Sequence, residues 1–172
     1  QMADKIYNVL FLCTGNSARS ILGEAVMNKL GAGRFKAWSA GSQPKGEVHP
    51  MALSVLSGMG YDTIGMYSKS WSEFSKPGSP EFDFIFTVCD SAAGEACPVW
   101  IGHPMTAHWG IEDPASVEGE GQRDAFLQAL RYLTNRISLF LTLPHASIDE
   151  MAMKQKLKEI GKAEGASSGA ST

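Results

Sequence analysis

The sequence predicts an α/β protein in which an open sheet of about four parallel strands lies in a three-layer arrangement, flanked by helices. Short apolar runs rich in strand formers alternate with segments of helical periodicity, which favours a parallel sheet with crossover connections. The length of 172 residues is that of one domain rather than two. Sheets of this kind bind ligands in loops at the carboxyl ends of their strands, so we expect a functional site there.

The elements are justified in order along the chain. Residues 6–12 form a continuous apolar run, as expected for a strand that is buried on both faces of a sheet. A helix is expected over residues 19–30, where apolar residues recur at helical spacing until Gly31 and Gly33 stop the pattern. Further strands are expected over 35–40, 82–88 and 105–109, and further helices over 49–59, after Gly121 and over 147–161.

Composition limits the classes of protein to be considered. With 44% hydrophobic and 19% charged residues, the chain can bury a core without disulfide bonds. We expect one domain over residues 2–161 and a disordered tail over 162–172, because the tail is small and polar. A net charge of -3 without a block of Lys or Arg argues against a nucleic-acid or membrane partner.

The cysteines indicate the compartment. Three cysteines are an odd number and too few for a secreted disulfide framework, which favours thiols in a reducing environment. No run of about 18 apolar residues is present, so no transmembrane helix is predicted. We therefore expect a soluble, cytoplasmic protein.

The loop between the first predicted strand and the first predicted helix has the composition of an anion site. Backbone amides at a helix N-terminus can surround a tetrahedral oxyanion. Gly15 permits unusual backbone angles, and Asn16 tolerates the left-handed conformation, so the loop can wrap tightly. The expected oxyanion-binding residues are Thr14, Gly15, Asn16, Ser17, Ala18, Arg19 and Ser20.

Cys13 opens this loop and is the predicted nucleophile. The field of the helix N-terminus is expected to lower the pKa of its thiol to roughly 3.5–7.5, which leaves a thiolate at neutral pH. Arg19 offers a planar fork that suits bidentate binding of oxyanion oxygens, and the Ser20 hydroxyl could donate a hydrogen bond to the thiolate. The alternative is a buried structural cysteine beside a turn, with Arg19 on the surface.

The Cys-x5-Arg-Ser pattern resembles the active-site loop of the low-molecular-weight protein tyrosine phosphatases and of the arsenate reductases built on that fold. The segment Ser39-Ala40-Gly41 resembles a second motif of this superfamily, and the resemblance extends from about Lys5 to Thr142. It implies a low-molecular-weight phosphatase-like sheet with flavodoxin-like strand order. Phosphatase and reductase both remain open at this point.

A second pair of cysteines bears on that choice. Cys89 ends the third predicted strand, and Cys97 follows after seven mostly small residues. The pair is open to three interpretations: half of a zinc site, two unrelated buried thiols, or a redox pair. If the intervening residues are helical, the two Cα atoms lie roughly 12 Å apart, whereas a disulfide needs about 5.5 Å, so the segment would have to unwind. The resemblance implies a redox pair, because arsenate reductases of this fold carry cysteines here and phosphatases generally lack them.

Asp113-Pro114 follows the fourth predicted strand. In isolation this dipeptide indicates a turn, but it resembles the general-acid motif of the family. The positions after it are Ala115 and Ser116, where tyrosine phosphatases tend to carry aromatic residues, and the preceding His-Trp-Gly resembles the reductases.

We expect no bound cofactor and no metal site, apart from one possible potassium site. Asn16, Glu24 and Ser39 resemble residues that hold a potassium ion in some of these reductases, although no further acidic ligand can be assigned.

Two positions depart from the family pattern. Ala18 stands where many members carry a second loop cysteine, and Ile21 matches neither the phosphatases nor the reductases.

The resemblance as a whole implies arsenate reduction by a thiol relay. Cys13 would attack arsenic, Arg19 would bind the charge and Asp113 would protonate the leaving hydroxide. Cys89 and Cys97 would then carry the disulfide to an external reductant, either thioredoxin or glutaredoxin with glutathione. Two alternatives remain: a hydrolase of tyrosine or aryl phosphate monoesters, and a non-catalytic oxyanion or redox sensor.

Overall fold

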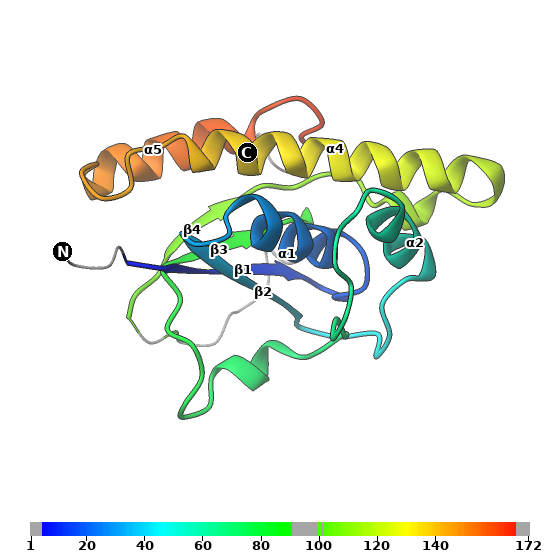
Figure 1. Ribbon diagram of the computed structural model, residues 1–172, viewed down its shortest axis with the longest axis horizontal. Coiled ribbons are helices and arrows are strands. Elements are labelled where there is room, and N and C mark those ends of the chain that lie inside the picture. The colour runs from blue at the N-terminus through cyan, green and yellow to red at the C-terminus, as the bar shows by residue number, and fades with distance from the viewer. Residues whose placement is uncertain (1–4, 91–99, 101, 168–172) are drawn as a thin grey trace.

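The sheet has the predicted architecture. The computed structural model describes residues 5–90, 100 and 102–167 (Figure 1). In this part of the chain, four strands form one parallel sheet in the order β2-β1-β3-β4. The strands are β1 (Tyr7–Cys13), β2 (Phe35–Gly41), β3 (Phe84–Thr87) and β4 (Met105–His108). This confirms the fold class and places the loop after β1 at the carboxyl edge of the sheet.

Four α-helices of the described residues pack together over one face of this sheet (Figure 1). They are α1 (Arg19–Leu30), α2 (Pro50–Gly58), α4 (Gln122–Leu141) and α5 (Glu150–Gly161). The opposite face is covered, within the described residues, by the loop that contains the 3-10 helix η1 (Trp71–Phe74). Within the described residues, helices therefore cover one side of the sheet, whereas the other side is covered mainly by loop.

Strand β1 explains why its sequence is apolar throughout. Val9 and Phe11 point into the core beneath the helices, while Leu10 and Leu12 belong to the smaller cluster on the other face. All four side chains are essentially fully buried. A strand with two buried faces has no solvent-facing position, so its sequence shows no alternation.

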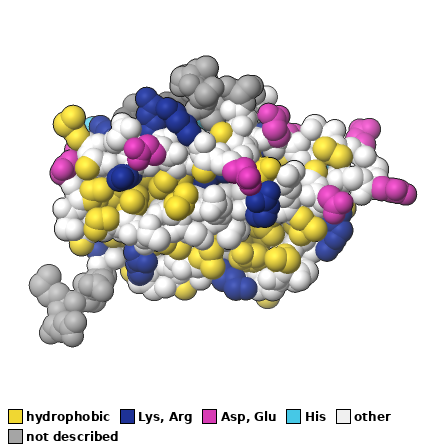
Figure 2. Space-filling model, turned by 90° about the horizontal axis from the view of Figure 1, so that it is seen from above, with side chains coloured by type: hydrophobic (Ala, Val, Ile, Leu, Met, Phe, Trp, Pro, Cys, Tyr) yellow, Lys and Arg dark blue, Asp and Glu magenta, His cyan; other side chains and the backbone are white. Residues whose placement is uncertain are grey.

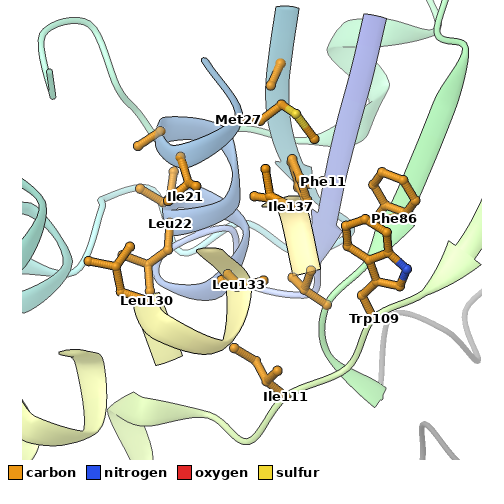
Figure 3. Close-up of a cluster of buried hydrophobic side chains, with 14 of the residues drawn as sticks. Phe11, Ile21, Leu22, Met27, Phe86, Trp109, Ile111, Leu130, Leu133 and Ile137 are labelled. Atoms are coloured by element: carbon orange, nitrogen blue, oxygen red, sulfur yellow. The ribbon is translucent and has the colours of Figure 1, made fainter. Parts of the chain in front are cut away.

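The larger core joins the sheet to α1 and α4 (Figure 3). The stripe predicted after Gly121 is buried along α4, where Leu130, Leu133 and Ile137 face the sheet. Trp109 stacks on Phe86 with ring centroids 3.7 Å apart. This packing fixes the chain just after β4, directly before the Asp113 loop.

The outer side of the helical layer carries mixed charge. Figure 2 shows Lys and Arg interspersed with Asp and Glu among apolar side chains on this face. Within the described residues, none of the helices is both long and apolar enough to cross a membrane.

The C-terminal segment differs from the prediction. Residues 162–167, expected to be disordered, are held by contacts that composition does not reveal. Ser167 is buried, its amide donates to Gly110 O at 3.0 Å, and its hydroxyl donates to Asp90 Oδ1 at 2.7 Å. Ala166 forms a bridge with Ile111. The remainder of the expected tail, residues 168–172, lies outside the described residues.

Candidate active site

The loop between β1 and α1 turns its carbonyl groups outward. Three of these carbonyls accept hydrogen bonds from backbone amides of the segment 43–49. The pairs are Gln43 N with Thr14 O at 2.9 Å, Lys45 N with Gly15 O at 3.0 Å, and His49 N with Ser17 O at 2.8 Å. Because N–H and C=O of a planar trans peptide point in opposite directions, the amides of these peptides face the interior of the loop. The result is a concave array of donors of the kind that binds anions.

Asn16 holds the shape of this loop. It is fully buried and adopts the left-handed conformation with φ 45°, as expected. Its side-chain amide donates to Ser20 Oγ at 2.8 Å, and its Oδ1 accepts the Lys69 amide at 2.8 Å. One expectation changes, because Gly15 does not adopt a positive φ. Ser20 Oγ accepts from Asn16, which leaves donation by its hydroxyl to the Cys13 thiolate as a prediction.

Gly41, at the end of β2, lets the loop lie against the sheet. A Cβ at this position would stand 2.8 Å from Cys13 O and closer still to Thr14 O. Because both neighbours are backbone atoms, the loop would have to move to make room. The Ser39-Ala40-Gly41 motif is thus explained by close backbone approach.

Gly41→Ala is expected to weaken phosphate binding and to lower the free energy of unfolding by about 1–3 kcal/mol, the usual cost of overpacking. Calorimetric titration with phosphate and thermal denaturation measure the two effects. The matched control is Gly58→Ala in α2, where an added methyl would meet only the end of the Arg123 side chain. Equal effects of the two substitutions would contradict this account of Gly41.

Cys13 and Cys89 meet at the mouth of the loop. Both are buried, and Cys89 Sγ accepts the Thr14 amide at 3.3 Å. The hydrogen bond with the Cys89 thiol, together with burial, raises the pKa of the Cys13 thiol well above its ordinary value, while Arg19 acts in the opposite direction. The expectation of a lowered pKa is therefore wrong for this state. The physical reason is a second sulfur, that of Cys89, which lies 76 positions along the chain and contacts Cys13 in the fold.

Arg19 spans the site from the first turn of α1. Its Nη1 donates to Ile111 O at 2.9 Å, and its Nη2 lies 3.9 Å from Asp113 Oδ2. Its Nε is buried and has no hydrogen-bond partner among the described residues. A buried donor without a protein partner is costly, and Arg19 lines the same cavity as the loop, so this group suits a bound oxyanion.

Asp113 stands opposite the loop. Its Oδ1 accepts the Ala115 amide at 3.0 Å, which caps the short 3-10 turn η2 (Pro114–Ser116). Its side chain is 41% exposed. The turn interpretation is confirmed, and the cap holds the carboxylate beside Arg19. The role of Asp113 as a general acid stays a prediction.

These residues enclose a cavity of about 300 Å³. A larger hollow of about 1080 Å³ lies beside β4 and α5, near the amino ends of β3 and β4, and contains none of the predicted site residues. The smaller cavity is lined by Cys13, Thr14, Gly15, Ser17, Ala18, Arg19, Gln43, Lys45, Cys89 and Asp113. Gln43 and Lys45 were not predicted, since a short polar segment carries no local signal for contact with the loop.

The comparisons with known proteins can now be set beside this geometry. A family model described as low molecular weight phosphotyrosine protein phosphatase matches residues 8–158. The chain belongs to this family. Among its curated relatives, an arsenate reductase from Bacillus licheniformis is 34% identical over 125 residues, covering 72% of this chain and 86% of the relative. A glutaredoxin arsenate reductase from Synechocystis is 29% identical over 106 residues, covering 62% and 77%.

Solved structures of the family superpose on the chain. An arsenate reductase in the phosphate binding state has a TM-score of 0.60 at 28% identity, covering 77% of this chain and 97% of that one. The thioredoxin-dependent arsenate reductase of Corynebacterium glutamicum has a TM-score of 0.62 at 22% identity, covering 86% and 66%. A low molecular weight protein tyrosine phosphatase from T. tengcongensis has a TM-score of 0.64 at 22% identity, covering 80% and 99%. At 22% identity, the last two similarities show that the chain shares the fold of these proteins.

The segment His108-Trp109-Gly110 lies beside the end of β3. His108 Nε2 lies 2.8 Å from Asp90 Oδ1, and its Nδ1 lies 2.7 Å from Thr87 Oγ1. Ser167 contacts the same Asp90 oxygen. These contacts fix the residue that follows Cys89, and thereby the point where the second cysteine leaves the sheet. The predicted partner Cys97 lies outside the described residues.

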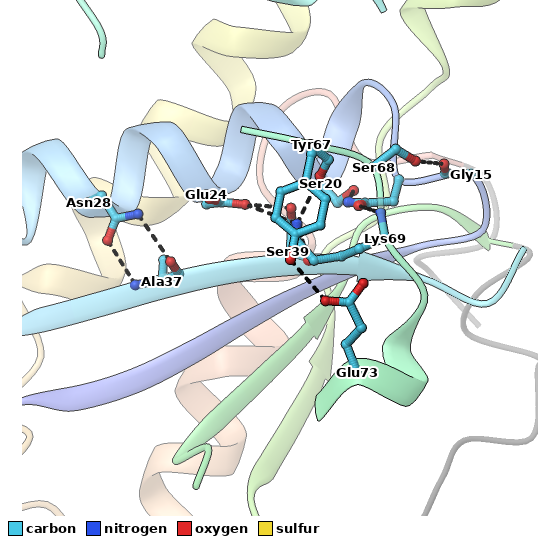
Figure 4. A network of polar contacts seen from close by, with 11 residues as sticks. Gly15, Ser20, Glu24, Asn28, Ala37, Ser39, Tyr67, Ser68, Lys69 and Glu73 are labelled. Atoms are coloured by element: carbon cyan, nitrogen blue, oxygen red, sulfur yellow. Dashed lines mark hydrogen bonds and ion pairs between the residues drawn. The ribbon is translucent and has the colours of Figure 1, made fainter. Parts of the chain in front are cut away.

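The three residues that resemble a potassium site all lie against one lysine, Lys69. Figure 4 shows Glu24 and Ser39 beside it. Lys69 Nζ donates to Ser39 O at 2.9 Å and lies 4.0 Å from Glu24 Oε1, which accepts the Ser39 hydroxyl. Asn16 Oδ1 is occupied by the Lys69 amide. The donor set therefore does not fit a potassium ion, because an ammonium group already neutralises its carboxylate. Within the described residues, no group of three or more His, Cys, Asp or Glu side chains could hold a metal ion.

Proposed function

We propose that this chain is an arsenate reductase that works by a thiol relay on the phosphatase fold. The observation that carries the proposal is the contact of Cys89 with both Cys13 and the Thr14 amide, inside the oxyanion-sized cavity. Hydrolysis of a phosphate ester requires water beside the nucleophile, whereas a reductase requires a second thiol. The names of the relatives support the same conclusion.

Arsenate binding is the first step. The inward-facing loop amides and the Arg19 guanidinium supply donors and positive charge for a tetrahedral oxyanion. The oxyanion displaces the Cys89 sulfur from the Thr14 amide. Removal of this sulfur from Cys13 removes the largest cause of the raised Cys13 pKa, so substrate binding prepares the thiolate.

The Cys13 thiolate then attacks arsenic. A sulfur–arsenic bond forms and an arsenic–oxygen bond breaks, while Asp113 protonates the leaving oxygen so that water departs. The guanidinium of Arg19, close to both the loop and Asp113, stabilises the charge that develops on the remaining oxygens. Arsenic is still in the +5 state at this point.

Cys89 carries out the reduction. Its thiolate attacks Cys13 Sγ, a disulfide forms, and the electron pair of the sulfur–arsenic bond stays on arsenic, which leaves as arsenite in the +3 state. The Cys97 thiolate attacks Cys89 Sγ next, which releases Cys13 and moves the disulfide outward. An external dithiol, thioredoxin or glutaredoxin with glutathione, restores both thiols; the names of two similar proteins support each kind of donor.

The test follows NADPH consumption that depends on arsenate, with thioredoxin and its reductase in one arm and glutaredoxin, glutathione and glutathione reductase in the other. Wild type, Cys89→Ser and Cys97→Ser are compared, and hydrolysis of an aryl phosphate is measured beside them. We expect arsenate turnover to fall to background in both variants while aryl phosphate hydrolysis is retained. Robust hydrolysis together with arsenate turnover that neither substitution lowers would contradict the relay through Cys89 and Cys97.

A further inference from the structure

Lys69 is a buried lysine that the proposed chemistry does not use. Its side chain is only 5% exposed and belongs to the loop between α2 and β3. The ammonium donates to Ser39 O and to Tyr67 O, each at 2.9 Å, and lies 4.4 Å from the centroid of the Tyr67 ring. Full enclosure of a lysine is rare unless its charge is paired, so this environment calls for an explanation.

The charge of Lys69 is matched within the cluster. Glu24 Oε1 lies 4.0 Å from the ammonium and accepts the Ser39 hydroxyl. Burial lowers the pKa of Lys69, and the carboxylates of Glu24 and Glu73 oppose that change. Burial raises the pKa of Glu24, and Ser39 and Lys69 act against it. Each charge therefore lowers the free-energy cost of burying the other, and removal of one leaves its partner buried and uncompensated.

The backbone of Lys69 connects this cluster to the oxyanion loop. Its amide donates to Asn16 Oδ1 at 2.8 Å, and its carbonyl accepts the Gly41 amide at 2.9 Å. The hydroxyl of the preceding residue, Ser68, donates to Gly15 O at 3.2 Å. Figure 4 shows Lys69 and Ser68 lying beside Gly15 of the loop and Ser39 of β2. The position of the ammonium is thus coupled to Asn16, the residue whose left-handed backbone shapes the loop.

We propose that Lys69 is a positioning residue whose ammonium serves as a built-in monovalent cation for the oxyanion loop. It occupies the place where the resemblance had suggested potassium, and so it makes anion binding independent of potassium in solution. An ammonium and a potassium ion carry the same charge and accept similar oxygen neighbours, which makes the exchange chemically reasonable. The inference rests on the proposed oxyanion loop, but it does not require that the bound anion be reduced.

The test measures binding of inorganic phosphate by calorimetry, in choline chloride and in potassium chloride of equal ionic strength. Wild type is expected to bind equally in both salts. Lys69→Ala removes the ammonium and opens space beside Glu24 and the two carbonyls. We expect it to bind phosphate about tenfold more weakly in choline, as is typical for loss of a residue that orients direct ligands, and to recover in potassium.

Three further variants make the result specific. Lys69→Met fills the same space without charge, so its weak binding should not recover in potassium. Adding Glu24→Gln to Lys69→Ala removes the carboxylate and should abolish the recovery. Lys76→Ala, at an exposed lysine of the following loop, is the matched control and should behave as wild type in both salts.

Two outcomes overturn the proposal: tighter phosphate binding by wild type in potassium, or Lys69→Ala affinity that is the same in both salts. The wild-type comparison remains decisive even if a variant fails to fold. Failure of the proposed function is a separate result, since arsenate would then not be reduced although phosphate binding still depended on Lys69.

Discussion

Asp113→Asn is expected to lower the turnover number for arsenate by about 10²–10⁴-fold, the contribution usual for a general acid. The asparagine keeps the oxygen that caps the Ala115 amide, so the η2 turn should persist. It cannot supply a proton to the leaving oxygen. Steady-state kinetics should therefore show a large fall in kcat with a small change in KM, and phosphate affinity should stay close to that of wild type.

The adjacent residue provides the control for this experiment. Glu112 is exposed, so Glu112→Gln removes the same charge one position away without entering the cavity. It is expected to retain nearly full activity. If the two substitutions reduce kcat equally, the effect comes from the net charge of the loop, and Asp113 is not the acid.

Cys89→Ala is expected to lower the pKa of Cys13 and to stop catalytic turnover. The contact with the Cys89 thiol is the largest cause of the raised pKa, and the substitution also releases the Thr14 amide. Each unit by which the pKa falls increases the thiolate fraction about tenfold at a pH below it. Alkylation of Cys13 by iodoacetamide at neutral pH should therefore become faster. Arsenate turnover should stop, because the variant lacks the second thiol of the relay.

The pH dependence of alkylation measures this shift directly. Because the pKa of Cys13 is raised in the anion-free wild type, its thiolate should appear only at high pH, whereas in Cys89→Ala the alkylation profile should move toward lower pH. Cys97→Ala removes one thiol as well and should leave the profile where it is in wild type. Profiles that coincide for wild type and Cys89→Ala would show that Cys89 does not control the nucleophile.

Much of the fold could be predicted because its signals are local. The apolar run of β1 and the helical spacing of α1 located those elements to within one residue, and the stripe along α4 identified its buried face. Ends were less certain where a side chain caps a helix. His49 was expected inside the second helix, but its Nδ1 accepts the Met51 amide, so α2 begins at Pro50.

The residues of the candidate site also differ in how far they could be predicted from local sequence. One short segment contains Cys13, the loop and Arg19. Its neighbouring residues predict the end of the strand, the left-handed conformation of Asn16 and the start of the helix. Asp113 was identified only through the family resemblance, since an isolated Asp-Pro indicates a turn. The expected disorder of residues 162–167 was wrong because composition cannot report the hydrogen bonds that Ser167 makes with Gly110 and Asp90.

The sequence by itself determined the class of sheet and the position of the loop between β1 and α1, and it predicted the nucleophile, because strand burial, helix periodicity and turn chemistry act over a few residues. Only the tertiary structure revealed the thiol that raises the pKa of Cys13 and the lysine that lies beside Glu24 and Ser39. Cys89 reaches Thr14 across 75 positions, and Lys69 reaches Asn16 across 53. Contacts at such separations depend on how the elements pack, and they set the charge and donors of the loop.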